Sequence, residues 1–265
     1  MKFDIVFHRI KSYLKYRLNA GNRHGLHSPF VYELYDEVIA VKDKYYAFDE
    51  IEKQRENLLT NANIISIKDF GAGSSISNSN ERKIKNIAKN SLIERKHGEL
   101  LFRLVNKFKP NTILELGTSL GISTSYLSKA NSQSTIYSLE GCPNTANIAK
   151  QTFKNLAIKN INLIEGNFDD SLNKLLEKKI HFDFIFIDGN HTYDATINYF
   201  NFLLPYVNED TVMIFDDIYW SKGMTKAWVE IKNNISVTIS IDLFKIGIVF
   251  FRKANKVQQH FILKY

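Results

Sequence analysis

Four residues in the second half of the sequence, Asp188, His191, Asp216 and Asp217, have the types and spacing needed for acid–base or metal chemistry. One apolar run ends at Asp188, and His191 follows three positions later. A second apolar run ends directly before Asp216 and Asp217. If the two runs are neighbouring strands about 4.8 Å apart, the three carboxylates meet at the edge of the sheet where α/β folds bind ligands.

Carboxylates this close repel one another unless a cation offsets their charge. An all-oxygen ligand set favours Mg²⁺, Mn²⁺ or Ca²⁺ over zinc, so Asp188, Asp216 and Asp217 are the predicted metal ligands. His191 is the predicted general base, because imidazole accepts a proton near neutrality. Asp188 and His191 are the predicted catalytic residues, and Asp188 is also a predicted cofactor-binding residue. The structural alternative is that Asp188 caps a helix and His191 packs beneath a loop.

Residues 112–125 have the pattern of a buried strand, a turn of small residues and the start of a helix. Such a turn presents backbone N–H groups and a carboxylate to a nucleotide-like ligand. Taken alone, its glycines could equally serve tight packing. The predicted cofactor-binding residues of this turn are Glu115, Gly117, Thr118, Ser119 and Gly121.

Two further positions extend the predicted cofactor site. Glu140 ends the next strand, about 20 residues after the turn, where nucleoside-binding α/β folds place an acid on the ribose hydroxyls. Asn167, Phe168 and Asp169 follow the third strand, where an adenine would lie, with Phe168 available to cover the ring. The alternative for Asn167 or Asp169 is the N-cap of a helix.

Alternating strands and helices from about residue 112 onward predict a parallel α/β sheet with crossover helices. The predicted strands are 112–116, 135–139, 161–165, 182–187 and 211–215, and the predicted helices are 122–130, 145–156, 169–178, 192–204 and 222–231. Two last strands, 237–241 and 246–251, are joined by a short turn and should pair antiparallel at the sheet edge. The predicted fold is a Rossmann-like seven-stranded sheet that is mostly parallel.

The predicted domains are a mainly helical extension, 1–99, serving as a lid or dimer arm, and an α/β domain, 100–265, that carries the candidate cofactor and catalytic residues. Apolar residues at helical spacing between residues 3 and 18, with Lys and Arg between them, predict a basic amphipathic helix. Its apolar stripe is expected to pack on its own domain or on a dimer mate, although such helices also lie on membrane surfaces. Further predictions are a helix at 31–40, a strand at 64–68, a flexible loop at 71–75, and helix from 81 to 107.

The motifs Glu115-Leu-Gly-Thr-Ser-Leu-Gly121, Glu140, Asp188-Gly-Asn-His191 and Asp216-Asp217 together resemble class I S-adenosylmethionine (SAM)-dependent methyltransferases. The first motif is similar to that of catechol and caffeoyl-CoA O-methyltransferases, which share Ser119 in place of a central glycine. The later motifs resemble those of macrolide-sugar and cephalosporin-pathway O-methyltransferases. This resemblance implies that SAM is the cofactor, that Mg²⁺ is held by the three aspartates, and that His191 deprotonates the acceptor hydroxyl.

Composition limits the other possibilities. The net charge is +7, but the basic residues are spread along the whole chain, so nucleic acid is not the expected partner. The single cysteine, Cys142, excludes an intrachain disulfide, and no apolar run approaches the roughly 20 residues of a membrane span. We therefore expect a cytoplasmic enzyme, compatible with a homodimer, that methylates a small-molecule hydroxyl of a sugar or phenol.

Two other functions stay open from the sequence. One is a nucleic-acid methyltransferase, although the Asn/Asp-Pro-Pro-Tyr/Phe motif usual in base-amine methyltransferases is replaced by Asp188-Gly-Asn-His191. The other is a non-catalytic SAM-binding or membrane-surface protein that uses the basic N-terminal helix. An NAD-dependent dehydrogenase fits less well, because a simple NAD-binding domain lacks the antiparallel ending.

Overall fold

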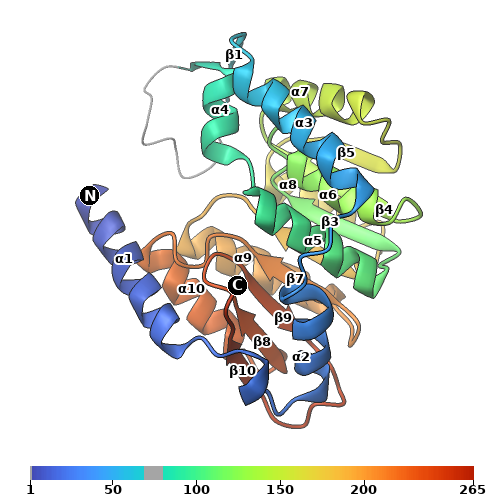
Figure 1. Ribbon diagram of the computed structural model, residues 1–265. Helices are drawn as coiled ribbons and strands as arrows, with labels where there is room; N and C mark the ends of the chain where they lie inside the picture. Colours follow the sequence, from blue (N-terminus) through green and yellow to red (C-terminus); the bar gives the residue numbers. More distant parts are fainter. Residues whose placement is uncertain (1, 69–79) are drawn as a thin grey trace. The chain divides into compact units, whose positions relative to one another are not determined.

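The computed structural model describes residues 2–68 and 80–265, which form two compact units (Figure 1). The first unit combines Met1–Val41 with His181–Tyr265, and the second unit is Lys42–Ile180. The predicted division at residue 100, between an N-terminal extension and the methyl-transfer domain, is a functional division and stays a prediction. The predicted loop at 71–75 lies outside the described residues.

The second unit is built on three parallel strands, with β4 between β3 and β5. Helix α5 packs against α6, and α3 packs against both α4 and α6. The Tyr126 hydroxyl in α6 donates a 2.8 Å hydrogen bond to Glu52 in α3, which fixes the two helices together. The elements of this unit are α3 (Tyr46–Thr60), β1 (Ile64–Ser66), β2 (Glu81–Lys83), α4 (Ile84–Ser91), α5 (Arg95–Phe108), β3 (Thr112–Leu116), α6 (Ile122–Ala130), β4 (Thr135–Glu140), α7 (Pro143–Asn155), β5 (Ile161–Glu165) and α8 (Phe168–Leu176).

The first unit contains five strands in the order β10-β8-β9-β7-β6, of which only β9 runs antiparallel to its neighbours. Every residue of β6 and β7 is buried, as expected for strands whose two faces are both covered. Its elements are α1 (Lys2–Asn19), α2 (Pro29–Leu34), a π-helical turn (Tyr35–Ile39), β6 (Phe184–Ile187), α9 (Tyr193–Leu203), β7 (Val212–Phe215), α10 (Lys222–Lys232), β8 (Ile239–Asp242), β9 (Gly247–Phe250) and β10 (Gln259–Ile262).

The predicted mostly parallel α/β architecture with an antiparallel C-terminal pair is confirmed. Local signals explain the helix starts: Ser221 caps α10 by accepting a hydrogen bond from the Met224 N–H, and Pro143 occupies the first turn of α7. The helix predicted at 31–40 begins earlier, at Pro29, because the Ser28 side chain caps it.

Two predictions about the strands were wrong. The β8–β9 pair does not form the sheet edge, because β10 pairs in parallel with the outer side of β8. Apart from the β1–β2 pair, the described residues of the two units contain eight strands rather than the predicted seven. The sequence Gln259-His-Phe-Ile262 is short and half polar, so its apolar content did not mark it as a strand. Residues 81–83 are not helical, because Glu81–Lys83 pairs antiparallel with β1 through Ile65 and Arg82.

Helix α1 packs on its own unit through a different face from the predicted one. The His8 imidazole lies 2.9 Å from the Thr225 hydroxyl, and the Tyr16 hydroxyl donates a 2.6 Å hydrogen bond to the Leu263 carbonyl. The apolar stripe remains uncovered by the described residues: its members Val6, Phe7, Ile10, Leu14 and Leu18 are 55% to 87% exposed. The helix therefore packs on its own unit, as expected, but through the side opposite these five residues.

Candidate active site

The turn between β3 and α6 is held to the end of β4 by backbone hydrogen bonds. The N–H groups of Gly117 and Thr118 both donate to the Leu139 carbonyl, at 3.0 and 3.1 Å. Gly121 has a φ of +85°, and a Cβ placed there would lie 2.6 Å from the Phe153 ring. Glycine at this position therefore serves both the backbone conformation and the packing of α7 against the turn.

Glu140 joins this turn to the next one. Its Oε2 accepts a 2.8 Å hydrogen bond from the Ser119 N–H, and its Oε1 accepts a 2.9 Å bond from the Cys142 N–H. Burial raises the pKa of Glu140, whereas these backbone N–H donors lower the pKa. A carboxylate has about four acceptor positions, so Glu140 can still accept hydrogen bonds from a ligand. The predicted association of Glu140 with the first turn is present in the structure.

Glu115 and Thr118 lie inside the second unit rather than on its surface. Glu115 Oε2 accepts hydrogen bonds from the Thr124 and Ser138 hydroxyls, each 2.5 Å long, and the Thr118 hydroxyl is 2.5 Å from that of Ser138. Both residues are fully buried. Their side chains thus connect β3, β4 and α6 and hold the elements on both sides of the turn.

One carboxylate oxygen of Glu115 lacks a hydrogen-bond partner within this network. No described residue makes a hydrogen bond to its Oε1, which is buried. Burial raises the pKa of Glu115, and the hydroxyl donors only partly offset that effect. No feature of the sequence marked Thr124 and Ser138, because hydroxyl residues in buried helices and strands look the same whether or not they donate to a carboxylate.

Ser91 is a further residue that the sequence did not indicate. It ends α4, and its hydroxyl lies 2.9 Å from that of Ser119 in the turn. The N-terminal helices of the second unit therefore reach the candidate cofactor site.

The loop after β5 combines two roles that the sequence left open. The Gly166 N–H donates a 3.0 Å hydrogen bond to the Glu140 carbonyl, so this loop adjoins the end of β4. The Asn167 side chain accepts from the Asp169 N–H at 3.2 Å and is the N-cap of α8. Asn167 and Asp169 are exposed and Phe168 is half-buried, so all three are accessible beside Glu140.

In the first unit, Asp188 and His191 lie next to each other after β6. His191 Nε2 is 3.5 Å from Asp188 Oδ1, and their side chains are 28% and 14% exposed. Burial lowers the pKa of His191, the Asp217 carboxylate raises the pKa, and the Lys245 ammonium lowers the pKa. A neutral imidazole beside a carboxylate has the arrangement of a general base with an orienting group.

Asp216 and Asp217 follow β7, and a lysine lies beside the second of them. Asp216 is 4% exposed, and burial together with the neighbouring Asp217 raises the pKa of Asp216 to about 7. Lys245 Nζ lies 3.9 Å from Asp217 Oδ1. Within residues 2–68 and 80–265, no group of three or more His, Cys, Asp or Glu side chains is arranged to hold a metal ion. The predicted ligand set therefore does not fit a metal as it stands.

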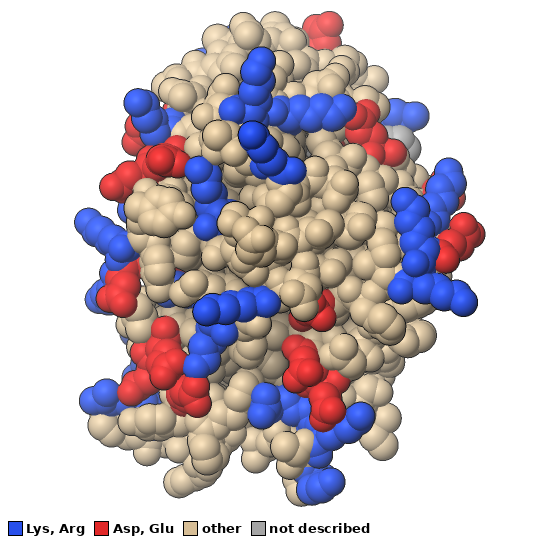
Figure 2. Space-filling model, turned by 90° about the vertical axis from the view of Figure 1, so that its right-hand side faces the viewer, with Lys and Arg blue, Asp and Glu red and all other residues tan. Residues whose placement is uncertain are grey.

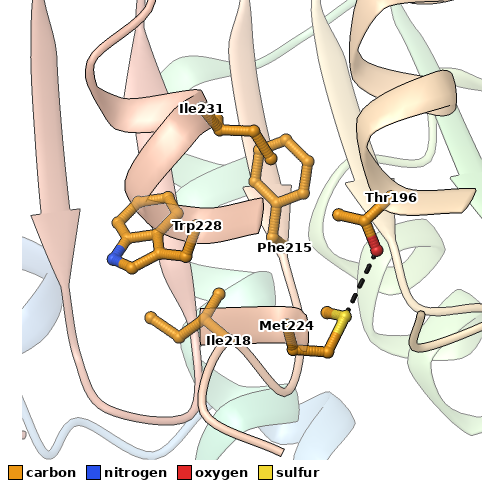
Figure 3. A pocket seen from close by; sticks show the side chains of 6 residues that line it. All are labelled: Thr196, Phe215, Ile218, Met224, Trp228 and Ile231. Atoms are coloured by element: carbon orange, nitrogen blue, oxygen red, sulfur yellow. Dashed lines mark hydrogen bonds between the residues drawn. The ribbon is translucent and has the colours of Figure 1, made fainter. Parts of the chain in front are cut away.

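An apolar pocket in the first unit is not a candidate site. It has about 150 Å³ of empty volume and is lined by Thr196, Phe215, Ile218, Met224, Trp228 and Ile231 (Figure 3). All six residues are buried, and the one hydroxyl donates to Met224 Sδ at 3.3 Å. With no charged group in its lining, this pocket belongs to the packing of α9, β7 and α10.

Charged side chains of both signs share the surface drawn in Figure 2. On the face shown in Figure 2, Lys and Arg side chains lie interspersed with Asp and Glu rather than in a single basic patch. Among the described helices, none is long and apolar enough to cross a membrane.

Comparison with known families decides the class of the chain. A family model described as "Methyltransferase domain" matches residues 114–218. This chain carries a methyltransferase domain. The match includes the β3 turn, Glu140, Asp188-Gly-Asn-His191 and the Asp216-Asp217 pair, so the predicted resemblance to methyltransferases is confirmed.

Relatives and solved structures extend this result. The chain is 30% identical over 129 residues to an uncharacterized protein of Acanthamoeba polyphaga mimivirus, covering 46% of this chain and only 58% of that protein. The SAH-bound methyltransferase PaMTH1 of Podospora anserina superimposes with a TM-score of 0.59 at 17% identity, covering 86% and 100% of the two chains. The O-methyltransferase of Bacillus cereus in complex with SAH gives a TM-score of 0.57 at 19% identity, covering 83% and 96%. At these identities the likeness shows that the methyltransferase domain has the class I fold.

The buried Glu115 makes a testable contribution to stability. Its folded-state pKa is raised, so the carboxyl group favours the folded state fully below its ordinary pKa of about 4.5. That contribution is lost as pH rises from there through the raised value. Glu115→Gln removes this titration. The free energy of unfolding of the variant, minus that of the wild type, should therefore increase as pH rises from 5 to 8. Urea unfolding at each pH measures the difference, and a constant difference across the range would contradict the assignment.

Proposed function

We propose that this methyltransferase binds SAM at the β3 turn and Glu140 and transfers its methyl group to a hydroxyl of a small molecule, such as a sugar or phenol. The observation that carries the proposal is Glu140, whose carboxylate holds the turn through the Ser119 N–H and keeps acceptor positions for ribose hydroxyls. A cytoplasmic location and a homodimer remain predictions from the sequence.

The residues of the second unit fit a nucleoside ligand. The N-cap of α6 is Gly121, which offers no side-chain cap to the first N–H groups of that helix. Unpaired N–H groups at a helix start favour a carboxylate or another anionic group. Asn167, Phe168 and Asp169 adjoin the end of β4 and are proposed to contact the adenine. SAM supplies an electrophilic methyl group on a sulfonium, so the protein's main task is to align the acceptor with it.

The residues of the first unit are proposed to act on the acceptor. Asp188 would hold the imidazole in position through Nε2, which lies 3.5 Å from its Oδ1, and would stabilise the charged form of the ring. His191 would then take the hydroxyl proton on Nδ1. The structural alternative for Asp188, a helix cap, does not apply to α9, because the cap of that helix is Thr192.

The predicted divalent cation is kept as a separate proposal. Asp188, Asp216 and Asp217 would hold it, and it would lower the pKa of the acceptor hydroxyl. Because their described arrangement does not fit a metal and Lys245 lies beside Asp217, no step of the proposed reaction is assigned to a metal.

Glu140→Ala should weaken SAM binding about ten- to hundredfold, since it removes a charged acceptor worth about 1.5–3 kcal/mol and frees the Ser119 N–H. Glu165→Ala is the matched control, because Glu165 is the register partner of Glu140 on β5 and pairs with Lys150 on the surface. Calorimetric titration with SAM measures both variants. Equal loss in the two variants, or no SAM binding by the wild type, would overturn the proposed cofactor site.

His191→Gln should lower kcat about 10²- to 10⁴-fold without changing the affinity for SAM, because general-base catalysis contributes about that much. Radiolabelled SAM and a panel of phenols, catechols and sugars identify an acceptor for the assay. His181→Gln removes an exposed histidine of the same unit and should have no effect. Unchanged turnover in His191→Gln would contradict the role of His191 as the base.

Lys245→Ala tests the metal proposal. Removing the ammonium 3.9 Å from Asp217 leaves the carboxylates without their cation, so Mn²⁺ should bind about tenfold more tightly than in the wild type. Adding Asp216→Asn to this variant should abolish the gain, whereas Asp210→Asn at an exposed turn should not. If Mn²⁺ binds neither the wild type nor Lys245→Ala, the three aspartates do not form a metal site.

A further inference from the structure

Helix α1 has an uncovered apolar stripe that methyl transfer does not explain. Val6, Phe7, Ile10, Leu14 and Leu18 recur at spacings of one, three and four residues and therefore share one side of the helix. All five are more than half exposed, and Leu18 is 87% exposed. A contiguous exposed apolar surface on a soluble unit marks an interaction site.

The opposite side of α1 is the side attached to the first unit. His8 lies against Thr225 of α10, and Tyr16 bonds to the Leu263 carbonyl and packs against Phe244. In Figure 1, α1 runs along the outside of this unit beside α10. The helix is thus held by its more polar side, and its most apolar side is directed outward.

The charges around the stripe select the kind of partner. At about 100° per residue, Lys11 and Lys15 lie along one border of the stripe and Arg9 along the other, while Arg17 lies within its last turn. All four are exposed, and the helix contains a single acid, Asp4. Arg9 also stacks on Trp220, with its guanidinium 4.7 Å from the ring centroid, and Trp220 is 40% exposed.

We propose that this face of α1 binds an anionic lipid surface, with the apolar stripe entering the headgroup region and the basic residues contacting lipid phosphates or carboxylates. An amphipathic helix with Lys and Arg beside its apolar face, and an aromatic ring near it, has the composition that binds such surfaces. A second copy of the chain is a poorer partner, because face-to-face stripes would bring the basic borders of two helices together. This proposal is independent of the methyl-transfer chemistry.

Co-sedimentation with vesicles tests it on the full-length protein. The wild type should bind vesicles containing about one third phosphatidylserine at low salt and should bind pure phosphatidylcholine weakly. Raising the salt to about 0.5 M shortens the screening length to a few ångströms and should release it. The double variant Phe7→Ser, Leu14→Ser should bind about tenfold less, as should Lys11→Glu, Lys15→Glu, by loss of apolar burial and of charge respectively.

Ile235→Ser is the matched control, since Ile235 is 91% exposed in the same unit but outside α1. It should bind as the wild type does, and circular dichroism verifies that every variant is folded. Failure of the wild type to bind anionic vesicles, equal binding to neutral vesicles, or full binding by both double variants would overturn the proposal. Sedimentation velocity without lipid gives the remaining outcome: a dimer that Phe7→Ser, Leu14→Ser dissociates, without vesicle binding, assigns the face to a second copy instead.

Discussion

The Glu140 carboxylate is the interaction on which the candidate cofactor site depends. One oxygen holds the Ser119 N–H of the β3 turn and the other holds the Cys142 N–H at the start of α7. Together with the bonds from Gly117 and Thr118 to the Leu139 carbonyl, it fixes two turns to the end of one strand. Because those bonds are charge-assisted, they offset the cost of partly burying the carboxylate. A site built in this way is formed before any ligand arrives.

A second carboxylate, Glu115, has the opposite environment. It is fully buried, and its hydrogen-bond donors are hydroxyl groups rather than backbone N–H groups. A buried carboxylate with one unpartnered oxygen is costly. What it provides is a link between β3, β4 and α6, the three elements that surround the turn. The position of the turn thus rests on two acids, one at the end of a strand and one inside a strand.

That difference explains how far the sequence could predict the site. Glu140 ends β4, Asp188 follows β6 and Asp216 follows β7, so all three lie where apolar runs stop. Glu115 precedes the last residue of β3. In a strand buried on both faces, the pattern of apolar residues does not reveal which way an acid points. The sequence therefore placed both acids beside the turn, but it could not separate the half-buried acid at the strand end from the fully buried acid inside the strand.

The same limit applied to the fold. Long apolar runs located β3 to β7 closely, whereas β10, with polar residues in half of its positions, depends on pairing with β8 and has no strong local signal. Helix α1 shows a related limit. Its periodicity predicted the helix, but periodicity alone does not say which side of a helix meets the protein, and here hydrogen bonds at His8 and Tyr16 decide it.

The acidic group of the first unit includes a basic residue that the sequence did not indicate. Adjacent aspartates after β7 were expected to need a divalent cation. In the structure, the raised pKa of Asp216, caused first by burial and then by Asp217, favours its protonated form, and Lys245 lies near Asp217. The Lys245 ammonium supplies one positive charge beside this pair. Lys245 comes from the β8–β9 turn, far along the chain from both aspartates, so only the folded arrangement makes it part of this group.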